Sequence, residues 1–459
     1  MRTRTTLVVL LAVVVFTAGC GGGGKKSTGN RLTFWSAEDN PERVRATQAI
    51  INRFEQQSGI KVKLVPVAED EVQSQITRAS AAGSAPDVLG ALPLGFMSSL
   101  AADGITDPDA AAVVINALGR ETFSKRGLSL VEANGEPVAV PSDSWTQLLI
   151  YRKDLFHKAG LAAPTTFEAI ETAARRFKRD GIAGIVAPTK PDNLFTQQIF
   201  EYFALANNCQ LTDQRGNIIL TSKACVDTFK FYIDLIHNGS VTGEQDADTT
   251  RALYFQGRAA MVVWSSFIFD ELAGLSNDVR PTCPQCAGDR SFLANHSGIM
   301  TAIKGPDGTQ PSQFGEVTGF AITKDAKKDA AERFVEFMMS DGYVDWLALA
   351  PEGKFPIRTG TRDQPGKFAA AWDHLRTGVD RKAPLSKIYP PDVLNVLRTS
   401  TETMNRWGFP QGQGRLAGAQ LLALPIPKAL AAALSGKLDA ATAAQQVQAD
   451  MGKIARSVS

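Results

Sequence analysis

The chain has 459 residues, too many for one compact core, and its composition is that of an ordinary soluble globular protein of two or three domains. Without Arg2 and Arg4, which lie in an expected export signal, 47 basic residues balance 47 acidic ones. This neutrality gives no support to nucleic acid or to an anionic membrane surface as a partner.

Residues 1–20 have the three parts of an export signal: a basic start, an apolar run at residues 7–16 and a small-residue cleavage site. Cys20 follows Ala-Gly and resembles the lipidated cysteine of a bacterial lipobox, although Thr17 stands where Leu is usual. Residues 21–30 are a flexible polar linker. We expect an exported lipoprotein, anchored through Cys20 to the outer face of the cell membrane.

The next elements along the chain predict an α/β domain. Strands are expected at residues 31–35, 60–67 and 86–89, and helices at 44–54 and 71–82. Asn40 is a suitable N-cap for the first helix, and Gly59 a suitable stop. The β–α–β–α–β order implies parallel strands, whose carboxyl ends are the usual place for a ligand.

Residues 135–160 hold two short apolar strand patterns, at 137–141 and 147–151, with a polar joint between them. Such a joint is typical of a chain leaving one sheet and entering another. Trp145 lies in this joint, where it can either stack on a ligand in a cleft or close the core of one lobe.

Beyond the joint the elements remain mixed and no repeat of 20–50 residues is visible. We expect helices at 166–178, 194–206, 226–238, 249–256 and 330–339, strands at 182–187, 259–264 and 318–323, and a helical end from about residue 420.

Four cysteines remain in the exported chain, and an even number outside the cytosol favours disulfides. Cys209 and Cys225 flank an expected hairpin, and closing that loop adds about 3 kcal/mol in the chain-entropy model. Cys283 and Cys286 form a C-x-x-C without a strand-to-helix context or a second pair of ligands, so a local staple is preferred to a redox or zinc site.

Common catalytic motifs are absent from the sequence, including Gly-x-Ser-x-Gly and His-Glu-x-x-His. The four histidines lack metal-ligand spacing, so neither a metal nor a cofactor is expected and the protein is not expected to be an enzyme. A two-carboxylate glycoside hydrolase stays open, because its Asp and Glu pairs have no fixed spacing.

The order of several segments resembles the bacterial extracellular solute-binding proteins of family 1, the maltose-binding-protein-like receptors of ABC importers. The segments that carry the resemblance include RLTFWSAE, FEQQSGIKVKLV, AAGSAPDVLGA, NGEPVAVPSDSWTQLLIYRKDLF, YFQGRAAMVVWSS, TGFAITKDAKKDAAERFVEFMMS and EGKFPIR. Each is weak alone, but their order and spacing form a specific signal across residues 31–459.

The resemblance implies an α/β, two-lobed periplasmic-binding-protein-like (type II) fold with discontinuous lobes and a cleft between them. The expected lobes are residues 31–142 with 296–345, and 143–295 with 346–459. It also implies a monomer that closes on a small-molecule solute by hinge motion, delivers it to ABC permease subunits in the membrane, and does no chemistry on it.

Matching to the family also implies a set of cleft residues at strand ends and loops. The ligand-binding candidates are Glu38, Asp39, Asp143, Ser144, Trp145, Asp192, Asn193, Trp264, Ser265, Phe267, Gly353, Phe355, Arg358 and Trp407.

Several of these candidates have a plain structural alternative. Asp39 can be a helix N-terminal charge, Asp192 a turn residue and Trp264 a core residue. Arg358 can serve a structural ion pair. The loop at residues 91–96 departs from sugar-binding relatives in being largely apolar, which argues against a long oligosaccharide. A smaller or partly apolar ligand, an amino sugar and a glycerophosphodiester all stay open.

Overall fold

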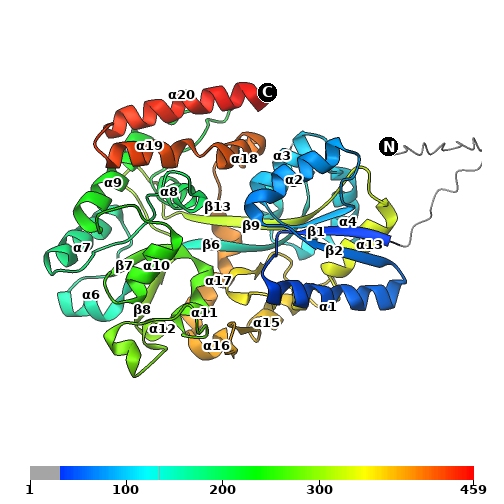
Figure 1. The fold of residues 1–459 in the computed structure, drawn as a ribbon, viewed down its shortest axis with the longest axis horizontal. Coiled ribbons are helices and arrows are strands. Elements are labelled where there is room, and N and C mark those ends of the chain that lie inside the picture. The colour runs from blue at the N-terminus through cyan, green and yellow to red at the C-terminus, as the bar shows by residue number, and fades with distance from the viewer. Residues whose placement is uncertain (1–30, 134, 459) are drawn as a thin grey trace, which may run out of the picture.

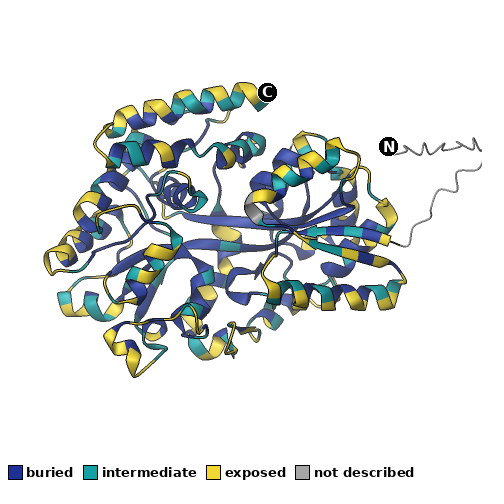
Figure 2. Ribbon diagram, in the orientation of Figure 1, coloured by how far each residue is buried: buried dark blue, intermediate teal, exposed yellow. Residues whose placement is uncertain are grey.

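The computed structural model describes residues 31–133 and 135–458, so the expected signal peptide, Cys20 and the linker lie outside the described residues. Two α/β lobes lie side by side, with strands in the centre and helices outside (Figure 1). Burial follows this arrangement, since the central strands are buried and the outer helices expose one face (Figure 2).

The first lobe begins with the predicted parallel strands. β1 (Arg31–Ser36) pairs in parallel with β2 (Lys61–Pro66) and with β3 (Val88–Pro93), as the β–α–β–α–β order required. The connecting helices are α1 (Pro41–Ser58) and α2 (Glu69–Ala81). The Asn40 side chain accepts the Glu42 backbone N–H, and Gly59 ends α1 in the left-handed conformation.

The polar joint of the sequence analysis is part of one long strand. β6 (Val140–Arg152) is continuous over 13 residues, so the prediction of two short strands separated by a loop is wrong. Its first half pairs with β9 (Gln313–Ile322), and its second half pairs with β7 (Met261–Ser265) and β8 (Ser297–Met300). β6 therefore runs from the sheet of one lobe into that of the other.

The pairing of β8 bears on where the chain returns to the first lobe. β8 lies on the second half of β6, in the same sheet region as β7, although residues 296–345 were expected in the first lobe. β9 pairs with β3 at its carboxyl end, residues Thr318 to Ile322. We place the return crossing within β9, later in the chain than the sequence analysis had it.

The second lobe carries the predicted helices as α7 (Phe167–Arg179), α8 (Leu194–Ala206), α9 (Lys223–Gly239) and α10 (Ala247–Phe255). Residues 182–187 do not form the predicted strand; they make only isolated bridges, one between Ala183 and Ala259 and one between Val186 and Val262. α13 (Lys328–Met338) covers the first lobe.

The chain ends in three helices, α18 (Gly414–Ala423), α19 (Pro425–Leu434) and α20 (Ala440–Val458). α20 packs against α9 of the second lobe, whereas α18 packs against α3 (Leu94–Ala102) of the first. A Cβ added at Gly418 would lie 2.3 Å from the Gly95 carbonyl oxygen, so the α18 and α3 backbones are in direct contact.

The remaining elements are mostly short and lie in the segments that connect those already described. They are α4 (Pro108–Leu118), α5 (Lys125–Val131), β4 (Glu132–Ala133), β5 (Glu136–Pro137), α6 (Lys153–Ala159), α11 (Phe269–Leu272), α12 (Phe292–His296), α14 (Tyr343–Leu347), β10 (Phe355–Pro356), α15 (Lys367–Trp372), β11 (Arg376–Thr377), β12 (Ala383–Pro384), α16 (Leu385–Ile388), α17 (Pro391–Thr403) and β13 (Met404–Asn405), with four 3₁₀ turns at Arg120–Thr122, Ser266–Ile268, Pro284–Ala287 and Pro351–Gly353.

Both predicted disulfides are present. Cys209 bonds to Cys225 and Cys283 bonds to Cys286, with S–S distances of 2.03 and 2.04 Å. Among the described helices none alone is long and apolar enough to cross a membrane; α18 and α19 meet that test only as a pair bent by 47°.

Candidate ligand-binding cleft

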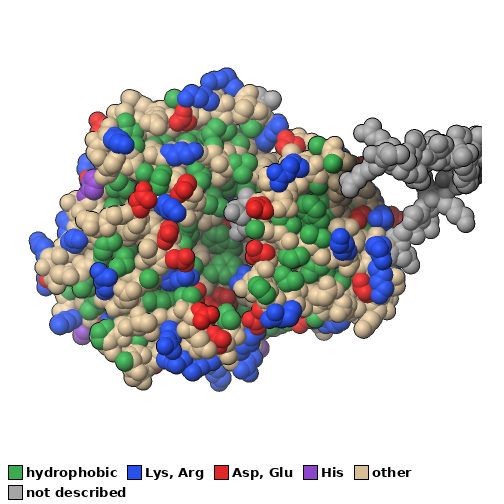
Figure 3. Space-filling model, in the orientation of Figure 1, with side chains coloured by type: hydrophobic (Ala, Val, Ile, Leu, Met, Phe, Trp, Pro, Cys, Tyr) green, Lys and Arg blue, Asp and Glu red, His purple; other side chains and the backbone are tan. Residues whose placement is uncertain are grey.

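A cavity of about 550 Å³ lies between the two lobes, at the carboxyl ends of β1, β3 and β7. Figure 3 shows a hollow in the middle of the molecule with hydrophobic side chains at its floor. The side chains and backbone that line the cavity come from both lobes: Ala37, Glu38, Asp39, Arg43, Ala68, Ala91, Pro93, Phe96, Asp143, Trp145, Leu194, Phe195, Gln198, Ala247, Trp264, Ser265, Phe267, Thr318 and Lys354.

A second cavity, of about 480 Å³, lies between α7, α9 and residues 304–306. Its lining comes from one lobe, so lobe motion cannot open or close it. The interlobe cavity is therefore the candidate site, and we call it the cleft.

Trp145 stands at the middle of the cleft, on β6 where that strand passes between the lobes. Its ring is half-buried and packs against Phe267 and Phe314, with ring centroids 6.2 and 5.7 Å apart. Gly353 lies behind Phe267, and a Cβ there would come within 2.1 Å of the Phe267 ring. The backbone at Gly353 thus holds Phe267 forward against Trp145.

Trp264 forms the wall of the second lobe, at the end of β7. Its indole N–H donates to the Ala247 carbonyl oxygen at 2.9 Å, and its ring lies 5.4 Å from that of Phe195. These contacts fix one edge of the indole, and only 9% of the residue is exposed. A small exposed strip of a fixed ring is suited to contact with an apolar ligand face.

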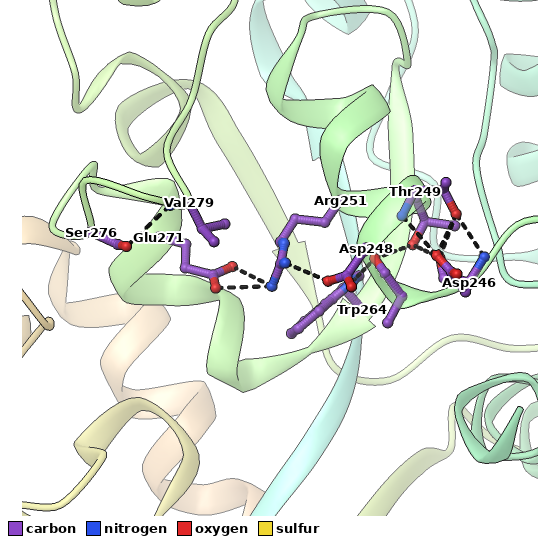
Figure 4. A network of polar contacts seen from close by, with 10 residues as sticks. Asp246, Asp248, Thr249, Arg251, Trp264, Glu271, Ser276 and Val279 are labelled. Atoms are coloured by element: carbon purple, nitrogen blue, oxygen red, sulfur yellow. Dashed lines mark hydrogen bonds and ion pairs between the residues drawn. The ribbon is translucent and has the colours of Figure 1, made fainter. Parts of the chain in front are cut away.

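A network of polar contacts holds Trp264 from behind (Figure 4). The Arg251 guanidinium lies 5.2 Å from the ring of Trp264 and is held between Asp248 and Glu271, at 2.5 and 2.9 Å. Asp246 caps α10, which carries Arg251. The indole is thus fixed by a cation with two carboxylate partners, so its position in the cleft does not depend on a ligand.

The charged residues of the cleft are paired with one another. Lys354 Nζ lies 2.5 Å from Glu38 and 3.3 Å from Asp143, and Arg43 lies 3.0 Å from Glu38. Burial alone would raise the pKa of Glu38, but the charges of Lys354 and Arg43 outweigh it and lower that pKa to about 2. Glu38 is therefore an ion at every physiological pH.

Asp143 is held by further donors in the same place. The hydroxyls of Ser142 and Thr318 and the Trp346 indole N–H all donate to its carboxylate, at 2.6 to 2.7 Å. Asp143 thus ties β6 and β9 together at the point where both strands pass between the lobes.

Asp39 differs from these carboxylates. Its side chain is exposed on the cleft rim and has no hydrogen bond or ion pair within residues 31–133 and 135–458. The first turn of α1 does not engage it, since Asn40 accepts the Glu42 N–H there at 2.9 Å.

Seven of the predicted site residues are not among those that line the cleft: Ser144, Asp192, Asn193, Gly353, Phe355, Arg358 and Trp407. Gly353, described above, lies behind the lining residue Phe267. Asp192 is exposed and 4.0 Å from Lys190, and Asn193 is the N-cap of α8. Ser144 and Phe355 face each other as paired residues of β6 and β10, both buried.

Arg358 and Trp407 are buried for structural reasons. The Arg358 guanidinium donates to the Leu118 and Met339 carbonyl oxygens and to the Thr122 hydroxyl, and it is 3% exposed. The Trp407 indole donates to the Cys209 carbonyl oxygen at 2.7 Å. Neither side chain reaches the cleft, and both are engaged by partners elsewhere in the protein, so ligand binding by Arg358 and Trp407 stays a prediction.

Twelve of the 19 lining residues are not among the predicted ligand-binding residues, and those with long or large side chains are Arg43, Phe96, Leu194, Phe195, Gln198 and Lys354. Phe195 and Gln198 occupy the first turns of α8, a helix buried almost all round, so no amphipathic pattern indicated its cleft face. The Asn193 cap was the available signal, because it placed the start of α8 beside the expected site.

Comparison with known proteins identifies the family. A sequence model described as "Bacterial extracellular solute-binding protein" matches residues 38–345, more than half of the chain. The chain belongs to this family. The matched range contains β6, β7 and β9 and all of the lining residues of the cleft except Ala37 and Lys354.

Individual relatives agree with this membership. The chain is 27% identical over 360 residues to "Putative ABC transporter periplasmic-binding protein YcjN" of Escherichia coli (strain K12), covering 76% of this chain and 78% of that protein. It is 22% identical over 309 residues to a binding protein of Brucella abortus (strain 2308), covering 65% and 69%.

Solved structures share the two-lobed fold. Maltose-bound MalE3 of T. maritima superposes with a TM-score of 0.66 at 19% identity, covering 92% of this chain and 99% of that one. The GacH receptor of Streptomyces glaucescens, solved without ligand and with acarbose, gives 0.68 at 19% identity, covering 92% and 98%. A sugar transporter protein of Arthrobacter chlorophenolicus with laminaribiose gives 0.69 at 16%, covering 92% and 99%. At these identities the likeness establishes the fold.

Proposed function

We propose that this solute-binding protein captures a sugar-class solute in the cleft and releases it unchanged to the permease of an ABC importer. The observation that carries the proposal is the pair of fixed indoles, Trp145 and Trp264, on a largely apolar cavity that also presents Asp39, Ser265 and Gln198. Apolar faces with a few polar groups at the edges match the two-sided chemistry of a sugar ring.

Two further points support the choice of solute. The volume of about 550 Å³ is in the range of small-molecule sites and suits a sugar of a few rings at most. The solved structures of similar fold hold maltose, acarbose and laminaribiose, which are ligands of those proteins.

Binding without chemistry is part of the proposal. A glycoside hydrolase needs one carboxyl group that is protonated near neutral pH to act as general acid. Glu38, with its pKa of about 2, cannot hold that proton, and the Asp143 carboxylate is occupied by three donors and Lys354. This arrangement favours a receptor over a hydrolase.

Delivery to a membrane permease and anchoring through Cys20 complete the proposal. The lipobox-like sequence at residues 17–20 supports export and lipidation, and the relative from E. coli bears the name of an ABC transporter protein. A monomer tethered by residues 21–30 would meet the permease at the membrane surface.

Isothermal titration calorimetry of the mature protein against neutral mono- and disaccharides tests the proposal. We expect saturable binding with one site per chain and full recovery of unaltered sugar by chromatography. Release of a cleaved product would identify a hydrolase instead. If Trp145→Ala and Trp264→Ala both bound the sugar as tightly as the wild type, the cleft would be refuted as the site.

A further inference from the structure

We propose that the cleft binds sugars that carry a protonated amine more tightly than their neutral parents and binds anionic sugars most weakly, an inference that rests on the proposed function. Asp39 recognises the ammonium group. The inference comes from the balance of paired and unpaired charges on the cleft wall. It narrows the solute to one chemical class, which neither the fold nor the family decides.

Among the described residues, both cations that line the cleft already have carboxylate partners. Two basic side chains, Arg43 and Lys354, line it, and both already contact carboxylates. Lys354 is 2% exposed and lies between Glu38 and Asp143, so an incoming phosphate or carboxylate would have to displace one of them. A buried charge stripped of its partner is strongly destabilising, which opposes such an exchange.

Arg43 keeps N–H groups beyond its contact with Glu38, but it belongs to a cleft wall whose described acids outnumber its bases. The Arg43 guanidinium lies 3.0 Å from Glu38, and the described charged residues that line the cleft are three acids, Glu38, Asp39 and Asp143, and two bases, Arg43 and Lys354. Figure 3 shows acidic and basic side chains interspersed along the rims of the hollow, with acidic side chains gathered at its lower end. The net negative charge of these lining residues therefore opposes the entry of an anionic ligand.

Asp39 is the carboxylate of the cleft left without a partner in the described part of the chain. Glu38 and Asp143 are fully engaged, whereas the oxygens of Asp39 take none of the first-turn N–H groups of α1 and contact no cation. The side chain stands on the rim, opposite the second lobe, where a bound sugar would bring its edge substituents. An ammonium group there would form a charge-assisted hydrogen bond without breaking an existing one.

The experiment compares a neutral, a cationic and an anionic disaccharide; the cationic one carries an amine on each of its two rings. Cellobiose, the β-1,4-linked glucosamine disaccharide and the β-1,4-linked disaccharide of glucuronic acid and glucose are titrated into the mature protein at about pH 6, where such amines are protonated. The α-1,4 series is run in parallel to cover a different linkage. We expect the amine to bind about tenfold more tightly than the neutral sugar, and the carboxylate to bind most weakly.

Two variants locate the effect. In Asp39→Asn the amine should lose most of its advantage, so that the amine and neutral affinities differ by less than about threefold. Asp109→Asn is the matched control, because Asp109 is also an exposed acid in the first lobe beside a helix N-terminus, but it does not line the cleft. It should keep the wild-type preference. Melting temperatures of both variants report folding separately.

The outcomes separate this inference from the proposed function. Equal affinity for the three sugars, tightest binding of the carboxylate, or an amine preference that survives Asp39→Asn would each overturn the inference while the protein remains a sugar receptor. Absence of binding by every sugar in both series would overturn the proposed function itself. Raising the salt concentration should reduce the amine preference and leave the neutral affinity unchanged.

Discussion

Arg406 lies between two buried carboxylates beneath the crossing of the lobes, and its replacement by Met is a direct test of how this region is held. Its Nε donates to Glu201 on α8 at 2.9 Å, and its guanidinium also pairs with Glu316 on β9. Glu316 in turn accepts the backbone N–H of Leu94 at the start of α3. One guanidinium thus joins three segments that also border the cleft.

The size of the expected loss in stability follows from how deeply the three side chains are buried. The side chains of Arg406, Glu201 and Glu316 are between 1 and 2% exposed, so Arg406→Met would leave two carboxylates without a counter-ion and without water. Breaking a buried ion pair in this way costs about 3–5 kcal/mol. That is a large part of the about 5–15 kcal/mol by which folded proteins are usually stable.

Urea unfolding followed by circular dichroism measures the loss, with an unchanged m-value as the sign that two-state behaviour is kept.

Burial already raises the pKa of Glu201 against the opposing charge of Arg406. Without Arg406 the pKa of Glu201 should rise further, so folding would take up protons and stability would fall as pH rises. The deficit of Arg406→Met should therefore be smaller at pH 5 than at pH 8.

The triple variant Glu201→Gln, Glu316→Gln, Arg406→Met is the matched control. It removes all three charges and should recover most of the lost stability, because no uncompensated ion remains. A loss below about 1 kcal/mol in Arg406→Met, or no recovery in the triple variant, would refute the reasoning.

Three further predictions concern the cleft wall, a buried acid and a disulfide. Trp264→Ala should weaken sugar binding by about 2 kcal/mol, or roughly thirtyfold in Kd by calorimetry, and an unchanged Kd would remove Trp264 from the site. Burial and the neighbouring Glu352 raise the pKa of Asp270 to about 8, so the stability that this proton contributes is lost as pH rises from about 4 to 8. Asp270→Asn should then be more stable than wild type at pH 8 and flatten the pH profile of urea unfolding; a steeper profile would contradict the assignment. Replacing Cys209 and Cys225 by Ser should lower the free energy of unfolding by about 3 kcal/mol, a difference that a reductant should abolish by lowering the wild type.

Local signals were enough for much of the first lobe. Asn40 and Gly59 mark the ends of α1 through their own side chain and backbone, and the alternation of strand and helix determined the parallel pairing of β1, β2 and β3. The close spacing of the cysteines likewise made the disulfides predictable. In each case the residues that decide the structure are neighbours in the sequence.

The features that the sequence did not indicate concern residues whose partners are distant along the chain. Ser142 and Asp143 look like loop residues, but Thr318, some 175 positions later, satisfies them inside a continuous β6. Arg358 looks like a free cation, but it donates to the Leu118 carbonyl oxygen, 240 positions earlier. Burial of a polar side chain depends on such partners, and a local pattern does not reveal them.

The antiparallel pair of β6 and β9 at the junction has a mechanical consequence. Stretching or shearing two hydrogen-bonded strands breaks ladder bonds, whereas twisting or flexing them perpendicular to the sheet leaves those bonds intact. The junction should therefore bend easily perpendicular to the sheet and resist deformation within the plane of the sheet. Trp145 lies on β6 at this junction, so bending would change the surroundings of its indole. Its fluorescence emission should therefore report the opening angle between the lobes without an added label.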